Sequence, residues 1–81
     1  MGRKDISMDI TLLKEKCIGI AYCFYQEKIQ EGLGMLEIVV GMVLQVPEFC
    51  DLINPLLDAV EKKDYVLAAD IFYHEIAMHI G

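Results

Sequence analysis

Apolar residues recur along this chain in steps of three and four residues, which is the spacing of one face of a helix. One such row in the first quarter of the chain consists of Ile10, Leu13, Cys17, Ile20 and Phe24. A second row on the same segment, Ile18, Tyr22, Tyr25 and Ile29, predicts that this helix contacts two neighbours. The third quarter carries the row Phe49, Leu52, Ile53, Leu56, Leu57 and Val60. Strand signals are nearly absent, since the sequence contains no Asn-Gly or Asp-Gly turn. We therefore predict an all-α protein.

Three breaks divide this pattern into four helices. The polar residues 26–30 predict the first turn, although Gly32 and Gly34 offer an alternative place for it. The residue before Pro47 is pushed out of the helical region, so the second helix ends there. Asp64 follows a polar corner and is a good cap for the last helix. We predict helices at about residues 8–27, 29–45, 48–62 and 65–80, arranged up and down in a single domain over residues 1–81.

The starts of two helices remain open at this stage. Ser7 or Asp9 can cap the first helix, and we expect residues 1–6 to be flexible. In the third segment Asn54 can act as a cap with Pro55 as the first helical residue, or Pro55 can lie inside a longer helix and kink it.

Residues 33–46 form a segment that is apolar almost all round as a helix, with only Glu37 and Gln45 to face water. Such a helix must be surrounded by protein or lipid. Fourteen residues span only about 21 Å, short of the roughly 30 Å hydrocarbon core, so this is not a transmembrane helix. It also lacks the basic polar face that is usual for helices lying on membranes. We therefore expect a second copy of the chain to cover it, in a homodimer.

The candidates for this homodimer interface are six residues of the second helix and two aromatic residues of the first: Leu33, Leu36, Val39, Val40, Met42, Val43, Tyr22 and Tyr25. Gly34 and Gly41 lie seven residues apart on one face of the second helix, where missing side chains let another backbone approach closely. The alternative is that both are merely tolerated, at about 1 kcal/mol each relative to alanine.

Composition narrows the class of partner. Hydrophobic residues make up 56% of the chain, an excess that suits a subunit interface. The net charge of −6 makes nucleic acid an unlikely ligand, because phosphate neutralisation needs clustered Lys and Arg. Cys17, Cys23 and Cys50 form no C-x-x-C motif and no paired framework. Three thiols without a secretory signal indicate a reducing cytoplasm.

From Tyr22 onwards the chain resembles a group of small all-helical bacterial proteins, known mainly from anaerobic Firmicutes, that has no established activity. Residues 63–76, with Asp64, Tyr65, Asp70 and Glu75, are similar to that group's Asp-Tyr-(Val/Ile)-Leu-Leu-Ala-Asp followed by Leu-(Glu)-Tyr-Glu. Phe24-Tyr25 and Leu56-Leu57 support the resemblance, whereas Ala68, Phe72 and His74 depart from it. The resemblance implies four helices with a turn after Phe24-Tyr25, and it draws attention to Asp64, Asp70, Tyr73 and Glu75.

The last helix contains the one cluster in the sequence with ligand chemistry: Asp70, His74, Glu75 and His79. On a regular helix the two i, i+4 pairs lie roughly 140° apart, so one helix does not focus all four on one ion. No catalytic constellation is evident, because Ser7 is the only serine and no Gly-rich phosphate loop follows a strand. We predict a non-enzymatic interaction or structural module that acts as a homodimer, without a cofactor or a metal. The alternatives are a small acidic chaperone or adaptor that binds an amphipathic client helix, and a carboxylate and histidine metal-binding protein.

Overall fold

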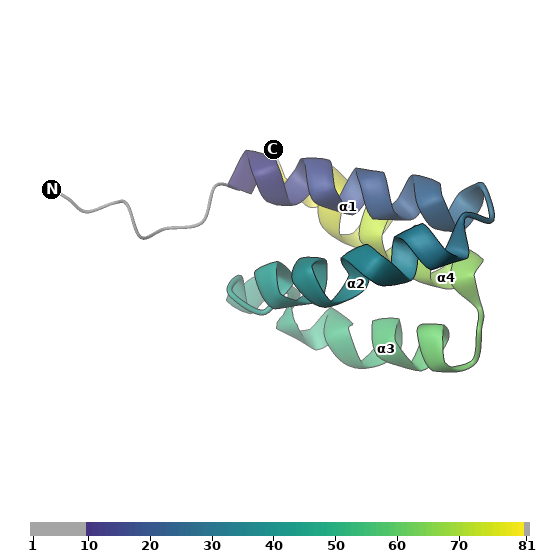
Figure 1. The fold of residues 1–81 in the computed structure, drawn as a ribbon. Coiled ribbons are helices and arrows are strands. Elements are labelled where there is room, and N and C mark those ends of the chain that lie inside the picture. The colour runs from purple at the N-terminus through teal and green to yellow at the C-terminus, as the bar shows by residue number, and fades with distance from the viewer. Residues whose placement is uncertain (1–9, 81) are drawn as a thin grey trace, which may run out of the picture.

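The computed structural model describes residues 10–80, and within them the chain is all-α, as predicted. Helices α1 (Ile10–Tyr25), α2 (Ile29–Val43), α3 (Ile53–Glu61) and α4 (Tyr65–Asp70) run alternately up and down. A 3₁₀ segment, η1 (Pro47–Leu52), leads into α3, while α4 is continued by the π-helical segment η2 (Ile71–Ile76) and the 3₁₀ turn η3 (Ala77–His79). Figure 1 shows α1, α2 and α3 one below the other, with α4 behind them. The predicted cap at Ser7 or Asp9 and the predicted flexible residues 1–6 lie outside the described residues.

The two hairpins of the bundle, α1–α2 and α3–α4, are closed by turns of the same type. The backbone N–H of Lys28 donates to the carbonyl of Cys23 at 2.7 Å, and the N–H of Asp64 donates to that of Ala59 at 2.8 Å. The residue before each donor has a positive φ, 61° at Glu27 and 60° at Lys63. These are the features of the Schellman helix end. The turn predicted at residues 26–30 is confirmed, and the glycines at positions 32 and 34 lie inside α2.

The third predicted helix, at residues 48–62, differs from the structure at its start. The chain first forms the 3₁₀ segment η1, with Pro47 as its first residue, where a missing N–H costs no hydrogen bond. Asn54 and Pro55 then lie within the first turn of α3, whose N–H groups have no helical partner in any case. The alternative in which Asn54 caps a helix that begins at Pro55 is therefore wrong.

The last predicted helix, at residues 65–80, is α-helical only as far as Asp70 and then widens into the π segment η2. Ala68 and Ala77 are both fully buried, although nine residues of a regular helix would place them on opposite sides. The wider π turn, with hydrogen bonds from i to i+5, takes up one extra residue and rotates Ala77 back toward the side of Ala68. The prediction of a regular last helix is thus corrected, and the π segment keeps its buried residues facing one core.

Helix α1 packs against α2 and against the last helix, which α4, η2 and η3 form. Helix α1 thus has two neighbours, as predicted, but the second apolar row does not account for them, because Tyr22 is 52% exposed and Ile29 belongs to α2. Eighteen hydrophobic residues form one buried core, and no polar or charged residue is buried among the described residues. Val39 and Val43 of α2 belong to this core at 0% exposure. We therefore remove both from the candidate interface, because a side chain buried inside its own chain cannot contact a second copy.

Candidate interaction surface

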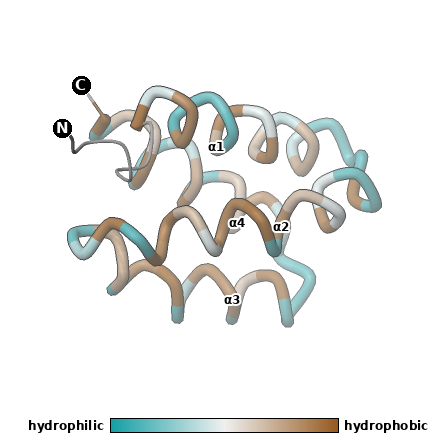
Figure 2. The backbone as a smooth tube through the Cα atoms, turned by 60° about the vertical axis from the view of Figure 1, so that its left-hand side comes forward, coloured by the Kyte–Doolittle hydropathy of each residue, from teal (hydrophilic) through white to brown (hydrophobic). Residues whose placement is uncertain are grey.

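The side of α2 that faces away from its buried residues is open and mainly apolar. We call it the α2 outer face and define it by Leu33, Gly34, Ile38, Gly41 and Leu44. Ile38 is 63% exposed, Leu44 52% and Leu33 38%. A Cβ atom added to Gly34 or Gly41 would meet nothing within 4 Å. No other part of the described chain therefore covers this face, and Figure 2 shows that much of α2 is hydrophobic.

Helical geometry explains why this face points outward. The buried residues of α2, Gly32, Val39 and Val43, lie on its inner side. At 100° per residue, Gly34 and Gly41 fall within about 20° of each other and roughly opposite Val43. Glu37 is also exposed on the outer side and, at 100° per residue, falls between Gly41 and Leu44 around the helix axis, so it interrupts the apolar face. Its own chain therefore buries only one side of α2, and the opposite side is open.

The remaining interface candidates divide into two groups. Leu36, Val40 and Met42 are half-buried and pack against the core, so they present only part of their surface. Tyr22 is 52% exposed and Tyr25 37% exposed, but both are on α1. Sequence reasoning did not select Ile38 and Leu44, the two most exposed large residues of the α2 outer face. The signal that identifies Ile38 is its position four residues after Gly34 and three before Gly41.

Tyr25 joins α1 to the last helix. Its hydroxyl donates a hydrogen bond to the Asp70 carboxylate, which stands at the end of α4. Burial, this hydrogen bond and the negative charge of Asp70 together raise the pKa of Tyr25 from 10.0 to about 12. Asp70, a member of the candidate ligand cluster of the last helix, is therefore held by a residue 45 positions away in sequence. This contact fixes the end of α1 against α4 and gives Asp70 a structural role.

Asp64 and Tyr65, which belong to the segment that carries the family resemblance, also make contacts that stabilise the fold. Asp64 caps α4, since its Oδ1 accepts a hydrogen bond from the N–H of Leu67 at 3.2 Å. The ring of Tyr65 packs against the ring of Phe24, with 5.4 Å between centroids. The cap fixes the start of α4, and the ring contact ties that start to the end of α1.

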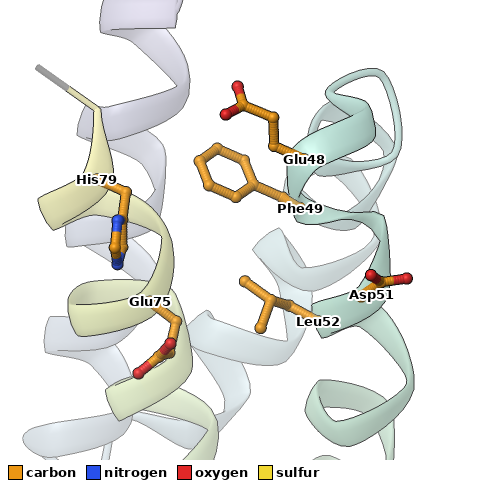
Figure 3. A pocket seen from close by; sticks show the side chains of 6 residues that line it. All are labelled: Glu48, Phe49, Asp51, Leu52, Glu75 and His79. Atoms are coloured by element: carbon orange, nitrogen blue, oxygen red, sulfur yellow. The ribbon is translucent and has the colours of Figure 1, made fainter.

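A shallow hollow of about 320 Å³ lies between η1 and the last helix (Figure 3). Phe49 and Leu52 supply its apolar lining, while Glu48, Asp51, Glu75 and His79 supply polar groups. Glu75 and His79 face this hollow, whereas Asp70 contacts Tyr25, so the predicted ligand cluster of the last helix is divided between two places. Within residues 10–80, no three His, Cys, Asp or Glu residues lie close enough to hold a metal ion.

Comparison with known proteins identifies no family for this arrangement of helices. No protein-family model, no curated protein and no solved structure matches the chain. Among the described helices, none has the length and apolar character needed to cross a membrane.

Proposed function

We propose that this protein is a non-enzymatic helical interaction module that acts as a homodimer. The observation that carries the proposal is the α2 outer face. There, two glycines with open space above them flank Ile38, the most exposed large hydrophobic residue among residues 10–80. Exposed apolar side chains that gather on one side of a helix are typical of a contact with another protein. In a protein that stays monomeric, polar residues could equally well occupy the exposed positions of the α2 outer face.

The size of the α2 outer face sets the expected strength of the dimer. Fifteen residues at 1.5 Å per residue give a helix about 22 Å long and about 10 Å wide, or about 220 Å² in projection. A standard interface buries roughly 800 Å² on each partner. The homodimer therefore belongs to the small, transient class and dissociates on dilution.

Two further observations support a non-enzymatic role in the cytoplasm. Cys17, Cys23 and Cys50 are free thiols, which suits a reducing compartment. Asp70, Asp64 and Tyr65 are engaged in contacts that hold the fold together. These three residues thus have structural explanations that require no reaction.

Sedimentation velocity of the full chain from roughly 1 µM to 1 mM, a range of about 4 kcal/mol in binding free energy, tests the proposal. We expect the weight-average mass to rise from one chain toward two, and Ile38→Glu to abolish the rise. Met78→Glu is the matched control, because Met78 is 62% exposed and lies on η3, away from α2. A monomer at all concentrations, or equal loss of association in both variants, would refute the proposal.

The hollow between η1 and the last helix favours a second function, the binding of a basic amphipathic client helix. Its apolar lining at Phe49 and Leu52 is bordered by the carboxylates of Glu48, Asp51 and Glu75, which complement a cationic partner. Fluorescence anisotropy with a lysine-rich amphipathic peptide tests this function. Binding of that peptide, but not of its glutamate-rich counterpart, would support it. Equal binding or no binding of the two peptides would contradict it.

A further inference from the structure

We propose that residues 4–9 of this chain bind, in an extended conformation, in the hollow between η1 and the last helix, with Lys4, Ile6 and Met8 turned toward it. These residues lie outside the described part of the chain. The inference goes beyond the proposed functions, because the contact is made within one chain and requires neither a second copy nor a client. It commits to this segment as the occupant of the hollow.

The first support is the place where the segment joins the bundle. The ring of Phe24, near the end of α1, contacts the ring of Tyr65, at the start of the last helix. Ile10 precedes Phe24 by fourteen residues, and His79 follows Tyr65 by fourteen. The two helices are antiparallel, and η3 contacts α1, so Ile10 and His79 lie at the same end of the bundle (Figures 1 and 2). The segment before Ile10 therefore joins the bundle at the end where His79 borders the hollow.

The second support is the length of the segment. Lys4 precedes Ile10 by six residues, and six extended residues span about 20 Å. A helix with its side chains is only about 10–12 Å across. The segment is therefore long enough to pass from the start of α1 across the last helix to η1, where Phe49 and Leu52 extend toward that helix (Figure 3).

The third support is the pattern of the segment. Polar and apolar residues alternate from residue 5 to residue 10, a period of two that predicts extended backbone in a chain otherwise patterned for helices. In extended backbone, successive side chains point to opposite sides. The even positions carry Lys4, Ile6 and Met8, whereas the odd positions carry only polar residues, Asp5, Ser7 and Asp9. An extended segment thus has one side with a base and two apolar residues.

The fourth support is the charge of the hollow. Glu48, Asp51 and Glu75 border it. Among residues 10–80 the one salt bridge joins two other residues, at positions 58 and 62, so no described base pairs with these three carboxylates. A base from outside the described residues would complement them.

The even side of the segment matches the hollow in both respects. Lys4 supplies the positive charge, and Ile6 and Met8 supply apolar side chains for the lining at Phe49 and Leu52. The acids of the segment are at odd positions, so they point away from the carboxylates of the hollow.

The covalent link explains why this segment, rather than a separate protein, occupies the hollow. A short tether keeps its end near the site at an effective concentration on the order of millimolar. Even a weak contact is therefore formed for much of the time. A basic client of the same hollow has to displace the segment before it binds.

Nuclear Overhauser effects in the full chain test the contact. We expect effects between the methyl groups of Ile6 and Met8 and the ring of Phe49, with relative intensities that stay constant on dilution, because the contact is made within one chain. Absence of these effects, or their loss on dilution, would overturn the inference. The homodimer is tested by concentration dependence at α2 instead, so either claim can fail while the other stands.

Two exchanges of neighbouring side chains give a matched variant and control. Lys4→Asp combined with Asp5→Lys keeps the composition and the net charge but turns a carboxylate toward the hollow, so we expect the Overhauser effects to disappear. Ile6→Met combined with Met8→Ile keeps the same side chains on the same side, so the effects should persist. Both exchanges lie before α1, outside the described core. Equal outcomes for the two exchanges would overturn the inference.

Discussion

Replacing Gly32 and Gly34 by alanine, one at a time, is predicted to change stability in opposite directions, although the two residues lie two positions apart in α2. Gly34 faces open space, and a Cβ there meets nothing within 4 Å. At Gly32 a Cβ would lie 2.5 Å from Cε1 and 2.8 Å from Cδ1 of Phe24. The Phe24 ring has little room to retreat, because it is 1% exposed and packs against the ring of Tyr65.

The magnitudes follow from two terms. Alanine in place of glycine inside a helix gains about 1 kcal/mol at either position. At Gly34 nothing opposes this gain, so Gly34→Ala raises the free energy of unfolding by about 1 kcal/mol. At Gly32 the methyl group overpacks the core, which costs about 1–3 kcal/mol. Gly32→Ala is therefore expected to lower the free energy of unfolding by about 1 kcal/mol, and the two variants differ by about 2 kcal/mol.

Thermal and urea unfolding, followed by circular dichroism at low concentration, measure this difference without a contribution from the dimer. For an 81-residue domain, 1 kcal/mol corresponds to about 4–8 °C in Tm. Gly41→Ala is the control, since its surroundings are as open as those of Gly34. If Gly32→Ala proved as stable as Gly34→Ala, the described packing of α2 on Phe24 would be refuted.

Three further predictions concern the remaining contacts. Burial and the hydrogen bond to Asp70 raise the pKa of Tyr25 to about 12, so one tyrosine should ionise last in an absorbance titration. The free energy of unfolding should fall as the pH rises from 10 toward 12, because the unfolded chain loses this proton first. Tyr25→Phe should remove the last ionisation step, and persistence of that step would contradict the assignment. Asp64→Ala should lower the free energy of unfolding by about 1 kcal/mol through loss of the α4 cap, with no change in urea m-value, and an unchanged midpoint would count against the cap. Burial raises the pKa of Cys17 to about 12, so at pH 8 its thiol should react with a disulfide reagent only after urea unfolds the chain. Prompt reaction of all three thiols in the folded protein would contradict the burial of Cys17 in the core.

Local signals in the sequence predict much of this fold. The polar residues 26–30 and the acid at position 64 mark the two hairpin turns, because helix ends and caps depend on residues close in sequence. The row of Leu13, Cys17, Ile20 and Phe24 identifies the buried side of α1, since its spacing has one clear direction. The π segment had no such signal, because a change from i+4 to i+5 hydrogen bonding depends on what the core must bury.

The α2 outer face is harder to predict from the sequence than the turns are, because it also depends on which residues the core buries. Hydrophobicity alone does not distinguish the inner side of α2 from its outer side, because both sides are apolar. The inner side has Val39 and Val43, and the outer side has Ile38 and the glycines at positions 34 and 41. Glu37 carries that information, since it marks the outer side, but the long apolar run around it obscures the direction. The partner of Asp70 is 45 residues away in sequence and follows only from the packing of α1 on α4.

The most direct test of the account is a dilution series of the ¹⁵N-labelled protein followed by NMR. The account predicts concentration-dependent amide shifts that cluster at Gly34, Ile38 and Gly41, with little change at Gly32 on the buried side of the same helix. Spectra that do not change with concentration, or changes that cluster around Val66 and Met78 instead, would contradict the claim that the α2 outer face joins two copies of this chain.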